Sequence, residues 1–393
     1  MNNDIKIHPL ILKIKNEIIE NRRYFHKYPE LSFQEFNTSK VIEEKLVNMG
    51  IAVQSGIAKT GLIADICGNK TGKTIGLRAD MDALPIQETS DVPYKSLNDG
   101  VMHACGHDGH IAMLLGAANA INQMKSKLNG TVRLIFQPAE EGPAGAAHMI
   151  DEGVLDNVDE IYGIHLWNYQ KIGEIGVKPG PIMAAADMFE IEIVGKGGHG
   201  ATPHGTVDAV VVASHLINSF QTIVSRNTNP IESTVITVGM INGGYNFNII
   251  ADKVILKGTT RAYTKNNRTL IKERMKDIIL GTEKMFEAKI NLNYKDGYPP
   301  TINDPKCADN VFTAATKIIG DNTHTPYLSM GGEDFSYYLE KIPGCFYFVG
   351  SSPKDRKPLS VPHHCSHFDI DEESLLIGAS SFVKIIEDLL INC

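Results

Sequence analysis

The densest group of chemically reactive side chains lies between residues 103 and 110. Three histidines, one cysteine and one aspartate occur there, just before a predicted helix: His103, Cys105, His107, Asp108 and His110. Thiolate and neutral imidazole groups are ligands of first-row transition metals, and Cys105 and His107 lie within one turn. A polar loop without any ligand is the alternative, but with only 14 histidines in 393 residues such a cluster is improbable by chance. The segment therefore predicts part of a metal site.

A pair of adjacent carboxylates follows the predicted strand at residues 131–137. Glu140 and Glu141 come shortly after this strand ends, and α/β proteins place their active sites at the carboxyl ends of strands. Neighbouring residues in an extended segment point to different sides, so one carboxylate can bind a metal while the other faces the reacting atom. A solvated pair that caps the next helix is the alternative, and this segment alone does not decide between the two.

Two further segments carry histidines near the same predicted sheet edge. His165 closes the predicted strand at residues 160–166, and the neighbours His363 and His364 lie in a predicted loop before the last helix. A single histidine at a strand end is usually structural. Four segments that converge on one edge of a sheet are better explained by a common site.

The elements that must position these residues alternate between strand and helix. Apolar runs predict strands at residues 61–66, 74–80, 131–137 and 160–166, and helical periodicity predicts helices at 8–26, 36–49, 111–124 and 144–153. This alternation favours an α/β domain with a mainly parallel central sheet.

The pattern changes near residue 185. Strands with apolar and polar residues in alternation are predicted at 188–195, 233–241 and 254–263, with helices at 206–224 and 266–288 between them. After residue 297 a buried strand at 345–350 and a closing helix at 374–390 restore the first pattern. We therefore predict an α/β catalytic domain with a mainly parallel sheet at residues 1–185 and 297–393. A smaller α+β domain at residues 186–296 interrupts it.

Composition bounds the class of protein. The hydrophobic fraction of 42% is typical of a globular protein and excludes a disordered or fibrous chain. The net charge of -8, without a long basic run, excludes nucleic acid and anionic membranes as expected partners. The amino-terminal segment has no apolar core of a signal peptide, and six cysteines are too few for a disulfide framework. We expect a cytoplasmic protein with free thiols.

One glycine-rich segment matches a dinucleotide-binding pattern. Gly195–Gly200 follows the G-x-G-x-x-G spacing after a strand, but no acidic residue ends the next strand at the distance that such a site requires. The cysteine and histidine spacings also do not match a zinc finger. We exclude both interpretations.

Seven segments, in order along nearly the whole chain, resemble the M20 metallopeptidase clan. The resemblance is strongest to its amidohydrolase branch, which contains N-acyl-amino-acid amidohydrolases, hippurate hydrolases and auxin-conjugate hydrolases. The segments are Arg22–Glu30, Gly76–Pro85, Met102–His110, Phe136–Gly142, Gly195–His199, Gly258–Arg261 and Gly332–Phe335. The Cys-Gly-His and Gln-Pro-Ala-Glu-Glu segments are the most specific to this branch.

The resemblance implies a site with two divalent metal ions, which could be Zn, Mn, Co or Ni. The implied ligands are Cys105, His107, Glu141, His165 and His364, with the Cys105 thiolate between the metals. Glu140 would be the general acid and base, and Asp82 would support the metal site as part of the catalytic set. His363 remains open as an alternative to His364 as the last ligand.

The resemblance also assigns roles to the inserted domain, as a lid and dimerisation domain. His199 would reach into an active site, often across a homodimer, and would serve both catalysis and substrate binding. Asn248 and Arg261 would contact the substrate.

The implied activity is hydrolysis of the amide bond of N-acyl-L-amino acids. Hippurate-like or N-acetyl substrates, which are small molecules, would yield a carboxylic acid and a free amino acid. An aminopeptidase or dipeptidase of the same clan is one alternative. A non-catalytic metal-binding scaffold is another, although the complete set of site residues argues against it.

Overall fold

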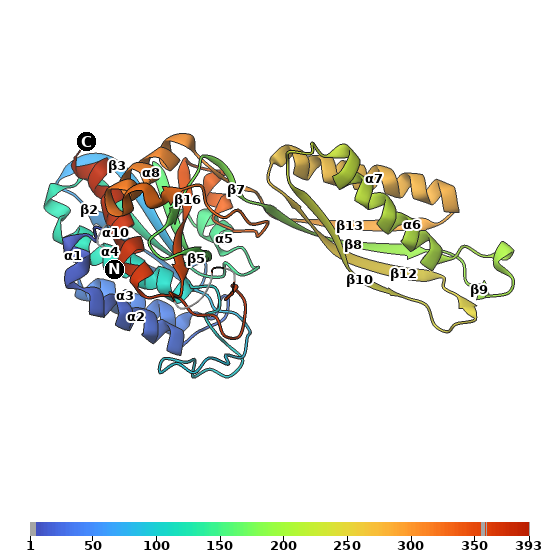
Figure 1. Cartoon of the computed structure of the whole chain (residues 1–393), viewed down its shortest axis with the longest axis horizontal. Coiled ribbons are helices and arrows are strands. Elements are labelled where there is room, and N and C mark those ends of the chain that lie inside the picture. Colours follow the sequence, from blue (N-terminus) through green and yellow to red (C-terminus); the bar gives the residue numbers. More distant parts are fainter. Residues whose placement is uncertain (1–4, 355–357, 359, 393) are drawn as a thin grey trace. The chain divides into compact units, whose positions relative to one another are not determined.

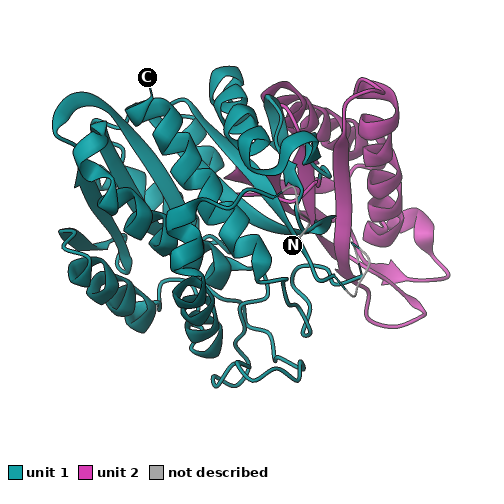
Figure 2. Cartoon of the chain, turned by 60° about the vertical axis from the view of Figure 1, so that its left-hand side comes forward, with its two compact units in different colours: residues 1–182, 302–328, 334–393 teal, residues 183–301, 329–333 magenta. Residues whose placement is uncertain are grey.

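The computed structural model describes residues 5–354, 358 and 360–392. Residue contacts divide the chain into two compact units (Figure 2). Unit 1 comprises Met1–Ile182, Ile302–Leu328 and Asp334–Cys393, and unit 2 comprises Met183–Thr301 and Ser329–Glu333. Each unit has a hydrophobic core of its own.

Unit 1 is built on an eight-stranded sheet with the order β1-β2-β4-β3-β5-β16-β6-β15. Its strands are β1 (Val53–Ile57), β2 (Gly61–Cys67), β3 (Lys70–Asp80), β4 (Asn129–Gln137), β5 (Glu160–Lys171), β6 (Ile175–Gly176), β15 (Thr323–His324) and β16 (Gly344–Ser352). The central strands β4, β3, β5 and β16 are parallel to one another, whereas β1 and β2 are antiparallel additions. The predicted α/β class with a mainly parallel sheet is confirmed.

Helix α4 (His107–Gln123) lies against this sheet and packs on α2 (Lys15–Lys27) and α10 (Glu373–Ile386) (Figure 1). Every residue of α4 from His107 to Ala118 is buried, because its neighbours cover it on all sides. Gly116 allows the close approach of α2, since a Cβ there would lie 2.7 Å from the Cδ1 atom of Ile18. The first residue of this buried helix is His107, one of the predicted ligands.

The remaining helices of unit 1 are shorter or peripheral. They are α1 (Pro9–Lys13), α3 (Phe36–Asn48), α5 (Gly145–Asp151), α8 (Pro305–Ile319) and α9 (Ser336–Leu339). The single helix predicted at residues 8–26 is two helices, because the chain leaves helical geometry at Ile14. A short strand, β7 (Gly180–Met183), and another, β14 (Thr301–Asn303), complete this part of the chain.

Unit 2 is a four-stranded antiparallel sheet with two helices on one face. The strand order is β10 (Thr234–Gly243), β12 (Lys253–Ala262), β8 (Ala185–Val194) and β13 (Lys289–Tyr298), and the helices are α6 (Ala209–Thr222) and α7 (Lys265–Phe286). Two short strands, β9 (Gly198–His199) and β11 (Ile249–Ile250), pair beyond the sheet. Strand β13 was not predicted, because Asn and Lys occupy most of its outward positions and few apolar residues mark it.

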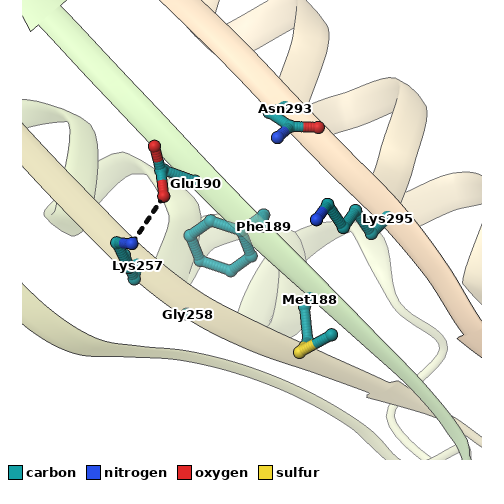
Figure 3. A pocket seen from close by; sticks show the side chains of 7 residues that line it. All are labelled: Met188, Phe189, Glu190, Lys257, Gly258, Asn293 and Lys295. Carbon is teal, nitrogen blue, oxygen red and sulfur yellow. Dashed lines mark ion pairs between the residues drawn. The ribbon is translucent and has the colours of Figure 1, made fainter. Parts of the chain in front are cut away.

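The open face of the unit 2 sheet carries a pocket of about 220 Å³ (Figure 3). It is lined by Met188, Phe189, Glu190, Lys257, Gly258, Asn293 and Lys295, and Glu190 pairs with Lys257 at 2.7 Å. None of the predicted site residues lines this pocket.

Among the described residues, no helix combines the length and the apolar character that crossing a lipid bilayer requires.

Candidate active site

Parallel strands bring the site residues of unit 1 to one edge of the sheet. Asp80, the last residue of β3, pairs in register with Gln137, the last residue of β4. The loops that follow these strands therefore start side by side, and they carry Asp82 and the Glu140–Glu141 pair. His165 lies within β5 rather than at its end, because this strand continues to Lys171.

The five predicted ligands come together in this structure. The ligand atoms of Cys105, His107 and His165 all lie within 4.8 Å of one another, and so do those of Cys105, Glu141 and His364. The Cys105 sulfur, common to both groups, lies 3.5 Å from His165 Nε2 and 3.3 Å from His364 Nε2. These two overlapping groups form a thiol-centred cluster suited to two neighbouring cations.

Hydrogen bonds fix the orientation of two of these histidines. His107 donates from Nδ1 to the backbone carbonyl of Asp82 at 2.8 Å, and His165 donates from Nδ1 to the carbonyl of Leu166 at 2.6 Å. In the neutral form of each ring, the form that binds a metal, the proton therefore lies on Nδ1 and Nε2 presents a lone pair. His107 Nε2 is buried without a hydrogen-bond partner. A ring held in this way is the usual arrangement of a metal ligand, so the residues fit a metal.

The neighbours His363 and His364 have different environments. His363 donates from Nδ1 to the Cys105 carbonyl at 3.2 Å and accepts at Nε2 from the Asn168 amide at 3.2 Å, so both nitrogens are occupied. Burial lowers its pKa to about 3. His364 is half-exposed and places Nε2 3.1 Å from the Glu141 carboxylate. Its φ of 63° lies in the left-handed region, which residues with a Cβ seldom adopt. The geometry favours His364 as the ligand.

Two more groups near the cluster are structural, and their roles were not predicted. His110 donates from Nδ1 to Asp80 at 2.5 Å and accepts at Nε2 from the Leu166 amide at 2.9 Å, which leaves no nitrogen for a metal. Burial alone would raise the pKa of Asp80, but the buried Arg78 guanidinium, 2.6 Å away, holds it well below its usual value. The sequence signals for this network were the Gly76–Pro85 segment, which contains Arg78 and Asp80, and the histidine cluster that contains His110, although that cluster predicted a metal site rather than this structural role.

Asp82 orients the carboxylate pair through the backbone. Its two oxygens accept hydrogen bonds from the amides of Glu140 and Glu141, each at 3.0 Å, and one also accepts from the Ser32 hydroxyl at 2.7 Å. Burial would raise the pKa of Asp82, but its contact with His107 lowers it, so the group is a carboxylate. Asp82 thus fixes the loop on which both glutamates lie.

The charges around Cys105 favour a cation. Burial, and then the negative charges of Glu141 and Glu140, raise the pKa of the thiol well above its usual value. A divalent ion is the group that stabilises a thiolate in such surroundings. Ligand atoms of Glu140 and Glu141 also lie within 4.8 Å of His107.

Unit 2 holds the other three predicted residues but does not bring them together. His199 in β9 pairs with Ile249, so Asn248 is its near neighbour, and both side chains are exposed. His199 accepts at Nδ1 from the Ala201 amide at 3.1 Å, which places the proton of its neutral ring on Nε2. Figure 1 shows β9 beyond the end of the sheet.

Lys253, the first residue of β12, lies at the end of the strand next to β11, whereas Arg261 lies eight residues further along, near the other end. Eight residues of extended strand span about 27 Å. Arg261 is half-buried and donates to the Thr260 carbonyl at 3.1 Å. Burial lowers its pKa below the usual value of an arginine.

Comparison with known proteins identifies the family. The model of Peptidase family M20/M25/M40 matches residues 76–388. The chain belongs to this family. The resemblance stated from the sequence motifs is confirmed.

Relatives in the M20 family extend over almost the whole chain. N-acetyl-L-cysteine deacetylase of Bacillus subtilis is 43% identical over 377 residues, which cover 94% of this chain and 87% of that protein. IAA-amino acid hydrolase ILR1-like 4 of Arabidopsis thaliana is 39% identical over 364 residues, covering 91% and 82%. The crystal structure of the Bacillus subtilis YXEP protein, described as a dinuclear metal binding peptidase, has a TM-score of 0.85 and 36% identity, covering 96% and 99%. The predicted class, a hydrolase of this family, is confirmed.

Proposed function

We propose that this M20 enzyme hydrolyses the amide bond of N-acyl-L-amino acids, using two divalent ions held by Cys105, His107, Glu141, His165 and His364. The observation that carries the proposal is the meeting of these five side chains around the Cys105 sulfur. The relatives support the substrate class, since their names describe an N-acetyl amino acid and an amino acid conjugate.

Glu140 is the group that moves the proton. When bound, a pair of divalent ions lowers the pKa of water and polarises a carbonyl. The Glu140 carboxylate accepts the proton of the attacking water and donates it to the leaving nitrogen, so that amide and water become acid and amine. Asp82 keeps Glu140 in place by accepting its backbone N–H. Glu140 is 6% exposed, and this burial excludes most bulk water from the transfer.

His199 and Arg261 would contact the substrate. The Nε2 proton of His199 can donate to the oxyanion of the transition state, and one such donor contributes about 3 kcal/mol. Arg261 can pair with the carboxylate of the amino-acid part. About 27 Å of strand separates Arg261 from the β9–β11 end of unit 2, a distance that no N-acyl amino acid spans. The two residues would therefore act on one substrate only if a second copy of the chain supplies one of them.

A homodimer through unit 2 satisfies this requirement. Strand β10 lies at an edge of the sheet and exposes Met240 and Ile241. The exposed side of α6 carries Val210 and Val211 and no charged side chain. An open strand edge beside an uncharged helix face is a common arrangement for pairing with an identical copy.

A hydrolysis screen tests the activity. Purified enzyme, loaded in turn with Zn, Mn, Co and Ni, is assayed on N-acetyl and N-benzoyl amino acids and on unblocked dipeptides. We expect the acylated amino acids to be cleaved faster. Preferential cleavage of dipeptides would favour the alternative, an aminopeptidase or dipeptidase.

Replacement of Glu140 tests the mechanism. In Glu140→Gln the neighbouring ligand Glu141 is unchanged, so the metal content should stay the same. The rate constant kcat should fall by at least about a hundredfold, the usual scale for a general acid and base. A variant with near wild-type turnover would exclude the role of Glu140.

Sedimentation velocity tests the dimer. We expect a dimer for the wild-type chain and a monomer for Met240→Lys, with Leu12→Lys as a matched control because Leu12 is an equally exposed apolar residue of unit 1. A wild-type monomer, or a dimer that survives the Met240 substitution, would contradict the interface.

A cytoplasmic location also remains a proposal, based on the free thiols of the described chain. Recovery of the tagged protein in an extracellular or membrane fraction would contradict it.

A further inference from the structure

Glu35 is a buried carboxylate that contacts the loop carrying Glu140. Its side chain has no exposure to solvent. One oxygen accepts a hydrogen bond from the Ala139 amide at 2.9 Å, and the other accepts from the Thr60 hydroxyl at 2.6 Å. Burying a charged group is costly unless it is hydrogen-bonded, and both donors here come from segments distant in sequence. The carboxylate therefore joins three parts of unit 1.

Carboxylates accept hydrogen bonds from three successive backbone amides, those of Ala139, Glu140 and Glu141, in the loop that carries Glu140. Glu35 accepts from Ala139, and Asp82 accepts from Glu140 and Glu141. Asp82 thus fixes the backbone of Glu140 and Glu141 directly. Glu35 fixes the backbone of Ala139, the residue that precedes them.

Ala139 is the point at which this loop turns. Its φ of 54° lies in the left-handed region, which residues with a Cβ avoid and which persists only where surrounding contacts impose it. The Ala139 carbonyl also accepts from the Gly145 amide at 2.9 Å. If Ala139 relaxed to an ordinary conformation, the direction of the chain into Glu140 would change.

We propose that Glu35 is a positioning residue for Glu140, acting through the Ala139 amide. This inference rests on the proposed function of Glu140. Glu35 holds the turn that aims the Glu140 carboxylate, while the ligand Glu141 keeps its separate contacts with Asp82 and His364. Loss of Glu35 should therefore reduce the rate of the reaction more than it reduces metal binding.

Three substitutions separate positioning from general packing. Glu35→Leu removes both hydrogen bonds. Glu35→Gln can keep both, because its amide oxygen can face Ala139 and its NH₂ group can donate to the Thr60 hydroxyl. Thr60→Val is the matched control, since it removes the other donor to Glu35 and leaves the Ala139 contact.

The expected result is a loss of turnover in one variant only. In metal-loaded enzyme, kcat of Glu35→Leu should fall about tenfold to a hundredfold, the scale of a small displacement of a catalytic group, with KM and metal content unchanged. Glu35→Gln and Thr60→Val should stay close to wild type. Should Glu35→Leu fail to fold, Glu35→Asp, which keeps the charge but is one methylene shorter, should show the same fall in kcat.

Hydrogen exchange gives a readout that does not depend on turnover. The amide of Ala139 should exchange faster in Glu35→Leu or Glu35→Asp than in wild type, and at the wild-type rate in Thr60→Val. Unchanged kcat in Glu35→Leu and Glu35→Asp, or an equal loss in Thr60→Val, would overturn the inference. If the wild-type enzyme cleaves no N-acyl amino acid, the proposed function fails, but exchange at Ala139 still decides whether Glu35 holds the turn.

Discussion

Most of the predicted site residues of unit 1 are buried, whereas two of the three in unit 2 are exposed. In unit 1, Cys105, His107 and His165 are 8%, 0% and 4% exposed. In unit 2, His199 and Asn248 are exposed on a short strand pair outside the main sheet. Metal ligands must be held at fixed distances, and the buried positions of Cys105, His107 and His165 suit their proposed role as ligands. Side chains that bind a substrate must be accessible to it, and residues outside the main sheet, on loops, are accessible in this way.

The units also bury their charges differently. In unit 1 the fully buried Arg22 contacts Asp108 and Asp369, each at 2.8 Å, and so links the helix of His107 to the segment after His364. In unit 2 Arg268 pairs with the buried Asp187 but remains 20% exposed. The buried network of unit 1 stabilises the surroundings of the proposed ligands, whereas the pair in unit 2 joins helix α7 to strand β8 and, through the Gly297 carbonyl, to β13.

Replacing the central arginine of each network should give the largest difference in stability. Arg22→Met removes the cation from the buried carboxylate of Asp108 and the partly exposed carboxylate of Asp369, and should cost about 3–5 kcal/mol of unfolding free energy. Arg268→Met should cost about 1–3 kcal/mol, because Asp187 keeps the Tyr294 hydroxyl and the Gly297 amide as donors. Amide hydrogen exchange, measured at increasing urea concentrations, gives the unfolding free energy of each unit separately. Equal losses in both variants would contradict the contrast between the networks.

Removing the shared thiol should strongly weaken metal binding in unit 1. In Cys105→Ser the affinity for metal should fall by more than about a hundredfold, since even residues that only orient a ligand contribute about 10–100-fold. Metal content after dialysis against a chelator series measures this. Cys345→Ser is the matched control, because Cys345 is a buried thiol of the same unit outside the cluster. Retention of both metals by Cys105→Ser would refute the ligand role.

Removing the exposed histidine of unit 2 should affect catalysis alone. His199→Ala should lower kcat about a hundredfold, the effect of losing one oxyanion donor, with metal content and stability unchanged. The control is His204→Ala, an exposed histidine of the same segment. If His199→Ala is as active as this control, His199 of unit 2 has no role in catalysis.

The smallest expected effect is on acid stability at the periphery of unit 1. The hydrogen bond with His8, together with Lys384, lowers the pKa of Glu387 from 4.5 to about 2. Because the folded-state pKa is depressed, the stabilisation is present above pH 4.5 and is lost as the pH falls towards 2. Solvent screens this partly exposed group, so its contribution is about 1 kcal/mol.

Unfolding at pH 5 and pH 3 checks this effect. The difference in unfolding free energy between wild type and Glu387→Gln should be larger at pH 5. The control in unit 2 is Glu192→Gln, where the partly exposed surface pair with Lys253, which solvent screens, should contribute no measurable stability. If the difference in unfolding free energy between wild type and Glu387→Gln is the same at pH 5 and pH 3, Glu387 is not the source of the pH-dependent stability.

The sequence alone determined the chemistry and most of the elements. Residue types and spacing marked Cys105 and His107 as candidate ligands and Glu140 and Glu141 as candidate active-site carboxylates, because ligand chemistry depends on the residue itself, and the family resemblance then assigned their roles. Hydrophobic periodicity predicted the strands and helices that position them, because local geometry repeats every two or 3.6 residues. It missed β13, whose outward positions are polar, and the break at Ile14.

Only the tertiary structure shows which atoms are free to act. It favours His364 over His363 as the proposed ligand by the partners of each ring nitrogen, and it places Arg261 far along β12 from the His199 segment. It also revealed Glu35, which no motif marked. Each of these facts depends on hydrogen bonds and burial created by segments distant in sequence, and such contacts leave no periodic signal in the chain.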